Sequence, residues 1–551
     1  MGIEQKLAIA ACVAVLTGIG YQCFPGHAWL HQDTQIYLPI LERLRDPSLF
    51  PGDPVALRPH VAYTIYDEMT LVLRNVLGGF HAALVLQQLL FRALGLFGAS
   101  LLARAAQLSW RMSLLVASLY GLGAFITGPS VLTLEYEPVP RGFAGPLLML
   151  AAGLAAHSRW VWAGAACGAA FLYHAPAALP FCLVFGLMIV FPQEGRAGRI
   201  RGLLPIVASI AIVLVISRFQ MGASEPQQFF KVVDDELAKL QQLRGSYNWV
   251  SLWNAQWIRN FEFLYLVTLA AWYRLRESAS APLRYLLAGL PLFGLLSIPL
   301  SYLLLEVLRW SLIPQVQPAR ATLFIVTMAV VGGGICGVRA AQQGRRWESV
   351  VWFMIAFAMP VERDVLQLLL PDLRQWLIVK RFLIVLGLSA TAMLASRWQA
   401  RRPSLSWTAW GACLLLPCYL FPGPGQVRNY PVLAHTELNQ LASWAKDNTA
   451  KEAVFLFPDQ GKELLPGMFR AHSLRAIYTD WKSGGQVNLL PGFAFEWWTR
   501  WQKTMEGKFE ADKLDRYRGL GIHYLVLKKA NPLPGRVPVY ANAKYFVYRW
   551  E

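Results

Sequence analysis

Long apolar segments, separated by short links that carry arginine, recur from the N-terminus to residue 421. A helix needs roughly 20 apolar residues to cross the hydrocarbon core of a bilayer. Apolar side chains make up 55% of the chain and charged side chains only 15%, against about 25% charged in soluble proteins. We therefore expect a polytopic α-helical membrane domain over 1–421. The thirteen predicted spans are 6–24, 82–103, 110–128, 142–157, 160–174, 176–191, 203–219, 260–275, 283–304, 321–340, 347–360, 381–396 and 406–421.

The short links carry arginine on one side of the predicted bundle, for example at Arg104, Arg159, Arg274 and Arg339. Short loops rich in Lys and Arg face the cytoplasm in membrane proteins. An odd number of spans with a cytoplasmic N-terminus then places the longer loops and the C-terminal tail outside. Those longer loops are 25–80, 129–141, 220–259, 305–320 and 361–380.

The formal net charge of +18 raises the question of a nucleic-acid partner. The arginines stand singly or in small groups at the ends of apolar segments, without a basic stripe or a nucleic-acid-binding motif. We therefore expect no nucleic-acid partner. The positive charge is explained by arginines that set the membrane topology and lie beside anionic lipids of the phospholipid bilayer.

The segment Phe421-Pro422-Gly423-Pro424-Gly425 cannot continue a helix and marks a domain boundary. Residues 422–551 are expected to form a small extracytoplasmic α/β domain. It contains no Gly-rich nucleotide-binding loop. The expected helices are 435–447 and 494–506, and the expected strands are 453–457, 475–478, 522–528 and 545–550.

The first extracytoplasmic loop is the richest in polar side chains, which are costly at the membrane edge unless they serve a site. His31 and Asp33 follow the first span directly. A carboxylate fixed there can act as a general base or hold a divalent cation. Asp33 is therefore the candidate catalytic residue and His31 a candidate substrate contact. The alternative is that Asp33 caps a helix beginning near Thr34, since Asp is a preferred N-cap residue.

The second loop carries two carboxylates and an arginine just before a span, in the run Glu135-Tyr136-Glu137-Pro138-Val139-Pro140-Arg141. Paired carboxylates suit a hard divalent cation such as Mg or Mn, so Glu135 and Glu137 are candidate metal ligands. Arg141 is a candidate contact for the phosphate of a donor. The alternative is an ordinary interfacial salt bridge between Glu137 and Arg141.

Two further candidates lie at the ends of spans on the same side. His174 stands where 160–174 and 176–191 meet, and these two short spans are expected to form a broken or re-entrant pair. It is a candidate substrate contact, with helix packing as the alternative. Arg320 opens a span and is a second candidate for the donor phosphate, since arginine makes bidentate contacts with phosphate oxygens. Its alternative is snorkelling to a phospholipid headgroup.

Charged and aromatic side chains flank a predicted strand in the tail. Arg470 precedes the strand, and Asp480, Trp481 and Lys482 follow it. Aromatic faces beside such charges can bind a sugar or a polyprenyl phosphate, which makes Arg470 and Lys482 candidate substrate contacts. For the tryptophans of the following helix, Trp497 among them, the alternative is packing against the sheet.

With an acidic first loop, a second acidic loop and a soluble C-terminal domain, the chain resembles the glycosyltransferase-C superfamily. Asp33 matches the first-loop acid of that superfamily, Glu135 and Glu137 match the second acidic pair, and Arg320 matches a donor-phosphate arginine by position. The tail pattern of Phe469-Arg470 to Ser473, Arg475 and Asp480-Trp481-Lys482 also resembles an uncharacterised bacterial group of multispanning membrane proteins. The tail lacks the Trp-Trp-Asp-Tyr-Gly motif of oligosaccharyltransferases, so the resemblance does not extend to peptide glycosylation.

The resemblance implies a glycosyltransferase of the bacterial inner membrane. Its partner would be a lipid-linked sugar donor, its acceptor a glycan, lipid or protein on the extracytoplasmic side, and its cofactor a divalent cation. Two other classes stay open, namely a transporter or flippase of lipid-linked glycans and a non-catalytic scaffold. A transporter predicts charges in the middle of spans, whereas most lie at the ends, Arg92 being an exception. Asp33 far from Glu135 and Glu137 would favour either alternative.

Overall fold

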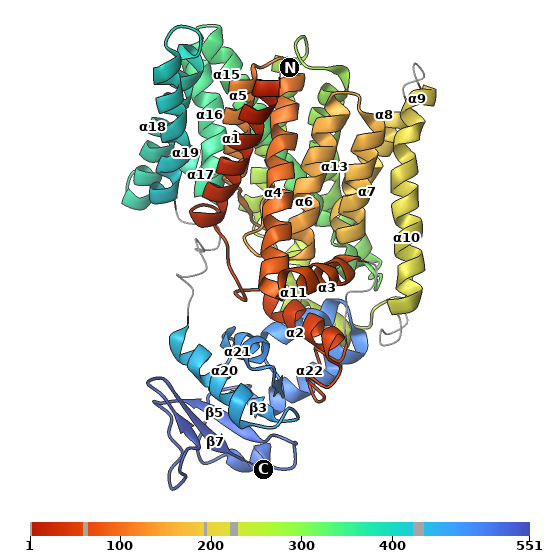
Figure 1. Ribbon diagram of the computed structural model, residues 1–551, viewed down its shortest axis with the longest axis vertical. Coiled ribbons are helices and arrows are strands. Elements are labelled where there is room, and N and C mark those ends of the chain that lie inside the picture. The colour runs from red at the N-terminus through yellow and green to blue at the C-terminus, as the bar shows by residue number, and fades with distance from the viewer. Residues whose placement is uncertain (1–2, 59–63, 192–195, 221–229, 422–434, 551) are drawn as a thin grey trace.

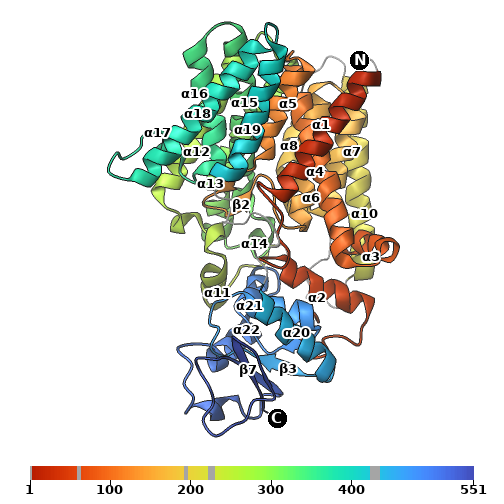
Figure 2. The ribbon, with the colours of Figure 1, turned by 60° about the vertical axis from the view of Figure 1, so that its left-hand side comes forward.

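A computed structural model describes residues 3–58, 64–191, 196–220, 230–421 and 435–550. It is a tall helical bundle with a smaller sheet-containing part at one end (Figures 1 and 2). All thirteen predicted spans coincide with helices. These are α1 (Ile3–Gln22), α4 (Phe80–Ala105), α5 (Trp110–Gly121), α6 (Pro140–Ala156), α7 (Trp160–Tyr173), α8 (Ala175–Val190), α10 (Leu204–Gln220), α12 (Ala255–Leu275), α13 (Ala281–Ser301), α15 (Leu323–Gln342), α16 (Arg346–Val361), α18 (Trp376–Trp398) and α19 (Pro403–Leu420).

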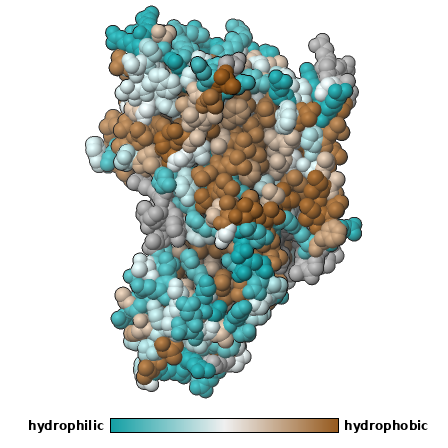
Figure 3. Space-filling model, in the orientation of Figure 1, coloured by the Kyte–Doolittle hydropathy of each residue, from teal (hydrophilic) through white to brown (hydrophobic). Residues whose placement is uncertain are grey.

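On the face seen in Figure 3, apolar surface covers the middle of the bundle, while hydrophilic surface covers the end opposite the tail and most of the tail. Large exposed apolar patches mark surfaces that meet a membrane or a partner. In the described chain, six helical segments are long and apolar enough to cross a bilayer. They are Ile3–Gln22, Phe80–Ala105, Gly198–Gln220, Ala281–Val307, Ile313–Gln342 and Trp376–Trp398. The bundle is therefore a multi-pass membrane domain, and thirteen complete spans stay a prediction.

The arginine-bearing links gather at the end of the bundle opposite the tail (Figure 1). Ser280 joins two of these links, because its N–H donates to the Ala105 carbonyl at 3.0 Å and its hydroxyl to the Ala156 carbonyl at 2.7 Å. Arg339 donates from Nη2 to the Ala106 carbonyl at 2.7 Å. The links thus share one face, as the charge pattern predicts.

Helix α15 runs through the centre of the bundle and is almost wholly buried. Its glycines let neighbouring helices approach closely. A Cβ at Gly334 would lie 3.0 Å from Leu119 of α5, and one at Gly337 would lie 3.0 Å from Phe353 of α16. Small residues at helix contacts are the usual means of close packing in membranes.

The crossing of α4 and α6 gives a test of this packing. A Cβ at Gly98 would lie 2.5 Å from the backbone of Met149 and Leu150. Overpacking a close contact costs typically about 1–3 kcal/mol. We expect Gly98→Val to lower the melting temperature of the detergent-solubilised protein. Gly186→Val in α8 is the matched control, because a Cβ there meets no atom within 4 Å. Equal melting temperatures for the two variants would contradict the expectation.

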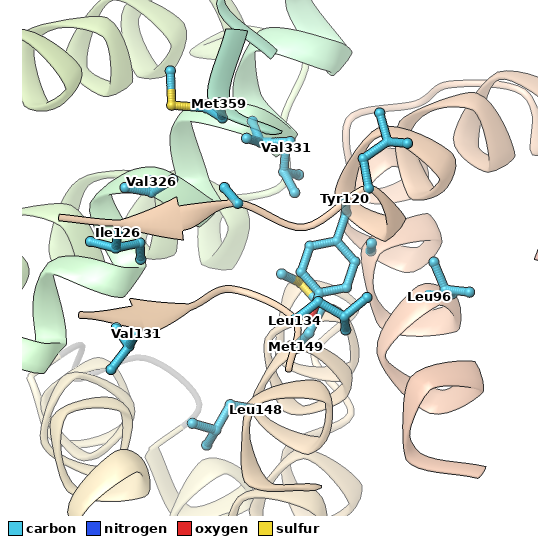
Figure 4. Close-up of a cluster of buried hydrophobic side chains, with 14 of the residues drawn as sticks. Leu96, Tyr120, Ile126, Val131, Leu134, Leu148, Met149, Val326, Val331 and Met359 are labelled. Carbon is cyan, nitrogen blue, oxygen red and sulfur yellow. The ribbon is translucent and has the colours of Figure 1, made fainter. Parts of the chain in front are cut away.

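The predicted span 110–128 is wrong at its C-terminal end. Helix α5 stops at Gly121, and the chain turns into a hairpin of β1 (Phe125–Ile126) and β2 (Val131–Leu132), in which Ile126 pairs with Val131. The hairpin lies among apolar side chains of the surrounding helices (Figure 4). Non-helical backbone is tolerated at membrane depth where protein buries it.

The rest of the second loop is also folded inward. Its two acids, Glu135 and Glu137, are 7% and 2% exposed. A loop expected at the surface therefore forms part of the interior of the protein, below the first loop.

The tail holds a five-stranded sheet in the order β4-β3-β5-β7-β6. Strands β4 (Ala476–Ile477), β3 (Val454–Leu456) and β5 (Tyr524–Lys528) are parallel, whereas β7 (Tyr545–Arg549) and β6 (Tyr540–Ala541) complete the sheet antiparallel. The helices are α20 (Thr436–Asn448), α21 (Leu465–Ser473) and α22 (Pro491–Thr504). All six predicted tail elements coincide with these, while α21 and β6 were not predicted. The boundary at 422–425 lies outside the described residues.

The first loop, the 220–259 loop and the tail share one apolar core. It joins Ile36 and Ile40 of α2 (Thr34–Arg45), Leu237 of α11 (Asp235–Gly245), and Phe493 and Trp497 of α22. Segments that share a core outside the bundle lie on the same side of a membrane. The predicted grouping of these loops with the tail is therefore what the packing requires, and the extracytoplasmic orientation stays a prediction.

Candidate functional site

Glu137 fixes the start of α2 against the second loop. Its Oε1 accepts from the N–H of Gln32 at 2.7 Å, and its Oε2 from those of Asp33 at 2.7 Å and Thr34 at 3.3 Å. Free N–H groups at a helix N-terminus attract a carboxylate. The side chain of Asp33 makes no capping hydrogen bond. The alternative in which Asp33 caps α2 is therefore wrong, because Glu137 takes that role.

Asp33 instead forms two ion pairs. Its Oδ2 accepts from Nη1 of Arg141 at 2.5 Å and its Oδ1 from Nζ of Lys482 at 2.6 Å. Nε of Arg141 also donates to Oε1 of Glu135 at 2.7 Å. Arg141 thus pairs with Glu135 and Asp33 and not with Glu137. A continuous row of charges joins the tail, the first loop and the second loop.

The pKa values of Asp33 and of Glu137 are shifted in opposite directions. Burial alone would raise the pKa of Asp33, but Lys482 and Arg141 hold that pKa well below its usual range. Burial, and then repulsion by Asp33, raise the pKa of Glu137 above its usual value, although hydrogen bonds from Thr34 and Gln32 oppose the change. Asp33 is therefore firmly ionised in this state of the protein.

A cavity with about 570 Å³ of empty space opens beside Arg141. Charged and polar side chains line one part of it, and apolar ones from β2, α8 and α15 line the rest. The polar lining comes from Glu135, Arg141, His174 and Arg320, and the apolar lining includes Val131, Pro176, Pro180, Leu323 and Phe324. A second cavity, lined in part by the same Leu323 and Phe324, continues among the apolar side chains of α6, α13 and α15.

Arg320 lies in a short helical turn, Pro318–Thr322, just before α15. Its guanidinium stands 5.6 Å from the ring centre of Tyr247. Its Nε is buried and has no hydrogen-bond partner among the residues that the structure describes. The cavity therefore has a second arginine beside Arg141, with donor capacity left for a ligand.

The two candidate histidines differ in position. His174 lines the cavity and also caps α8, since its Nδ1 accepts from the N–H of Ala177 at 3.1 Å. The capping bond agrees with the packing alternative for His174, and its substrate contact stays a prediction. His31 lies beside Tyr136, with 6.2 Å between ring centres. Burial, then His435 and Lys482, lower the pKa of His31, which favours a neutral imidazole.

Arg470 belongs neither to the ion pairs around Asp33 nor to the cavity lining. It is 1% exposed, and Nη1 donates to Oδ2 of Asp480 and to Oγ of Ser483, both at 3.1 Å. Nη1 also lies 3.6 Å from Oδ2 of Asp53 in the first loop. The structure thus gives Arg470 two buried carboxylates between the tail and the first loop, in place of the predicted substrate contact.

The acids of the site do not gather as ligands of a cation. Both oxygens of Glu137 accept backbone N–H groups, and Asp33 and Glu135 share Arg141. Within the described ranges, no three His, Cys, Asp or Glu side chains form a group able to hold a metal ion. The predicted Mg or Mn site thus does not fit this arrangement of donors, and we derive no step through a cation.

Two residues near the site were missed as site residues. Arg92 in α4 donates to the carbonyls of Gly26 and Glu135, both at 2.7 Å, and so fastens the first loop to the second. The sequence signal that could have identified Arg92 is its position within an apolar helix. Asp67, in the first turn of α3 (Tyr66–Leu77), has a buried Oδ1 without a hydrogen-bond partner in the described chain. Burial, and then Glu68, raise the pKa of Asp67 well above its usual value.

The helical bundle and its apolar surface define a multi-pass membrane protein. A family described as a domain of unknown function (DUF6798) matches residues 436–504 of the tail. No curated protein matches the chain.

Two glycosyltransferases are similar in structure. ArnT from Cupriavidus metallidurans, solved with undecaprenyl phosphate, is 14% identical with a TM-score of 0.40, covering 100% of this chain and 98% of that chain. The arabinofuranosyltransferase AftD from Mycobacteria is 14% identical with a TM-score of 0.42, covering 100% of this chain and 40% of that chain. Both belong to the glycosyltransferase-C superfamily, which the sequence resembles.

Proposed function

We propose that the chain is a membrane glycosyltransferase that transfers a sugar from a polyprenyl-phosphate carrier to an acceptor hydroxyl on the extracytoplasmic side. The cavity beside Arg141 carries the proposal, because it joins two arginines to an apolar wall. Arginine suits phosphate oxygens and apolar side chains suit a prenyl chain. A ligand with both parts would match the chemical character of this lining.

In the transfer, the acceptor oxygen forms a bond to the anomeric carbon of the sugar. The bond from that carbon to the phosphate oxygen breaks, and polyprenyl phosphate leaves with the electron pair. Arg141 and Arg320 receive the negative charge on the leaving phosphate. Asp33 takes the proton of the acceptor hydroxyl as general base.

Donor binding makes Asp33 a stronger base in this scheme. A phosphate held by Arg320 and Arg141 competes with Asp33 for the guanidinium of Arg141. Loss of that cation raises the pKa of Asp33 from its lowered value. The base is then activated only when the donor is in place.

The enzyme is favoured over a transporter by the local contacts. Asp33, Arg141 and Glu135 are joined by ion pairs, and Glu137 holds the backbone of Asp33. Arg92, the exceptional charge within a span, is engaged by carbonyl groups and not by a mobile counter-ion. We place the protein in a bacterial inner membrane, with a glycan, lipid or protein acceptor.

The function is tested with purified protein in lipid vesicles, a labelled polyprenyl-phosphate sugar and a panel of hydroxyl acceptors. Transfer of label with release of polyprenyl phosphate supports the proposal. Movement of intact donor between leaflets without transfer supports a flippase instead. Absence of both activities supports a scaffold.

Replacement of Arg320 tests the phosphate end of the cavity. A hydrogen bond to a charged group contributes about 1.5–3 kcal/mol, so Arg320→Ala should weaken binding of polyprenyl phosphate about 10- to 100-fold. Titration of polyprenyl phosphate against tryptophan fluorescence measures the affinity. Arg309→Ala is the matched control, because Arg309 pairs with Asp235 on an exposed surface. Equal affinities for both variants would remove Arg320 from the donor site.

A further inference from the structure

We propose that the tail acts on the site through Lys482, a positioning residue that holds the carboxylate of Asp33 against Arg141 of the cavity lining. This inference rests on the proposed function and gives a role to the tail segment 436–504. Nζ of Lys482 lies 2.6 Å from Oδ1 of Asp33. Neither Lys482 nor Asp33 is among the described residues that line the cavity, and the ion pair of Asp33 with Arg141 connects Lys482 to that lining.

The position of Lys482 is set first by Asp480. The Oδ1 of Asp480 accepts from the N–H of Ser483 at 2.7 Å, and its Oδ2 accepts from Arg470 at 3.1 Å. The carbonyl of Asp480 accepts from Nε1 of Trp497 at 2.9 Å. Asp480 and Arg470 are each 1% exposed. Buried ion pairs that are joined by several hydrogen bonds favour one local conformation.

The side chain of Trp481 adds a second restraint. Two cations contact its ring, Arg244 at 4.0 Å and Lys462 at 4.6 Å from the ring centre. Nη2 of Arg244 also donates to the carbonyl of Trp481 at 2.7 Å. Cation–π contacts are stronger where water is displaced. The residue immediately before Lys482 is therefore held on both its ring and its backbone.

Hydrogen bonds also hold the backbone around Asp33 in place. Glu137 holds the N–H of Asp33, and Arg470 donates from Nη2 to the carbonyl of Gln35 at 3.4 Å. These contacts fix the position of the tail relative to the start of α2. When a donor phosphate draws Arg141 from Oδ2 of Asp33, Lys482 still holds Oδ1, and the carboxylate keeps its direction.

Removal of this restraint should lower the rate without changing donor binding. A misplacement of about 1 Å can cost a factor of about 10² in rate. We expect Lys482→Met to lower kcat about 10- to 100-fold, with the donor KM unchanged, and Lys482→Arg to restore most of kcat. Lys528→Met is the matched control, because Lys528 forms a similar tail ion pair with Glu463 at 2.7 Å. It should transfer sugar like the wild type.

Two outcomes would overturn the inference. A raised donor KM with unchanged kcat would make Lys482 a substrate contact, and equal activity of Lys482→Met and wild type would leave it without a role.

A double-mutant cycle of Asp33→Asn and Lys482→Met, read from melting temperatures of the full-length protein, tests the contact without activity. Strict additivity would contradict the ion pair. A wild-type protein that transfers no sugar would instead refute the proposed function, while the cycle still reports on the contact.

Discussion

Replacing Asp33 by Asn is expected to lower kcat for sugar transfer about 10²- to 10⁴-fold, which is the usual contribution of general acid–base catalysis. The amide keeps the shape of the side chain but cannot accept the acceptor proton. Donor affinity should not fall, because Arg141 and Arg320 stay in the cavity lining and Arg141 loses the carboxylate that competes with the donor phosphate. Single-turnover transfer in lipid vesicles separates the chemical step from binding and release.

The fold should survive this change because Glu137 holds the backbone of Asp33 and not its side chain. Asp46→Asn is the control in the same loop, since Asp46 lies 3.7 Å from Lys451 and its hydrogen bonds from Ser48 go to Oδ1, an oxygen that Asn keeps. It should leave both kcat and the melting temperature as they are. A well-folded Asp33→Asn protein with kcat within about tenfold of the wild type would end the assignment of Asp33 as the base.

Replacing Arg470 by Leu should destabilise the folded protein by about 3–5 kcal/mol, the typical cost of breaking a buried ion pair by removing one partner. Asp480 and Asp53 would then remain buried near each other without their cation, at 1% and 0% side-chain exposure. Thermal unfolding of the full-length protein and limited proteolysis of the tail measure the effect. We expect a lower melting temperature and faster cleavage.

Arg518→Leu provides the comparison for this change. Arg518 pairs with Asp515 at 3.1 Å on an exposed turn of the tail, and exposed pairs contribute about 0–1 kcal/mol. Its melting temperature should match that of the wild type. An Arg470→Leu protein as stable as Arg518→Leu would show that the tail does not depend on the buried carboxylates.

The helices of the bundle could be predicted because their signal is local. An apolar run such as 82–103 has few alternatives to a helix in a bilayer, and α4 (Phe80–Ala105) is where it was expected. The end of α5 could not be predicted in this way. Hydropathy does not distinguish an apolar helix from the apolar hairpin that begins at Phe125, since both are buried.

The candidate site was predicted in part. The sequence pointed to Asp33, Glu135, Glu137, Arg141 and Arg320, which the structure brings together, because polar side chains at the membrane edge are costly unless they serve a site. Which partner each of these side chains takes could not be predicted. Sequence reasoning paired Glu137 with Arg141 or with a cation, whereas Glu137 caps α2 and Glu135 holds Arg141.

By itself, the sequence determined a multi-pass helical protein with a small α/β tail, because hydrophobic length and periodicity act over one helix or strand. Only the tertiary structure decided that Lys482 meets Asp33, 449 residues away, and that Arg470 lies buried behind them. Such contacts depend on how loops from several helices pack together. The packing selected backbone N–H groups for Glu137 and Arg141 for Glu135, a choice that no local sequence pattern contains.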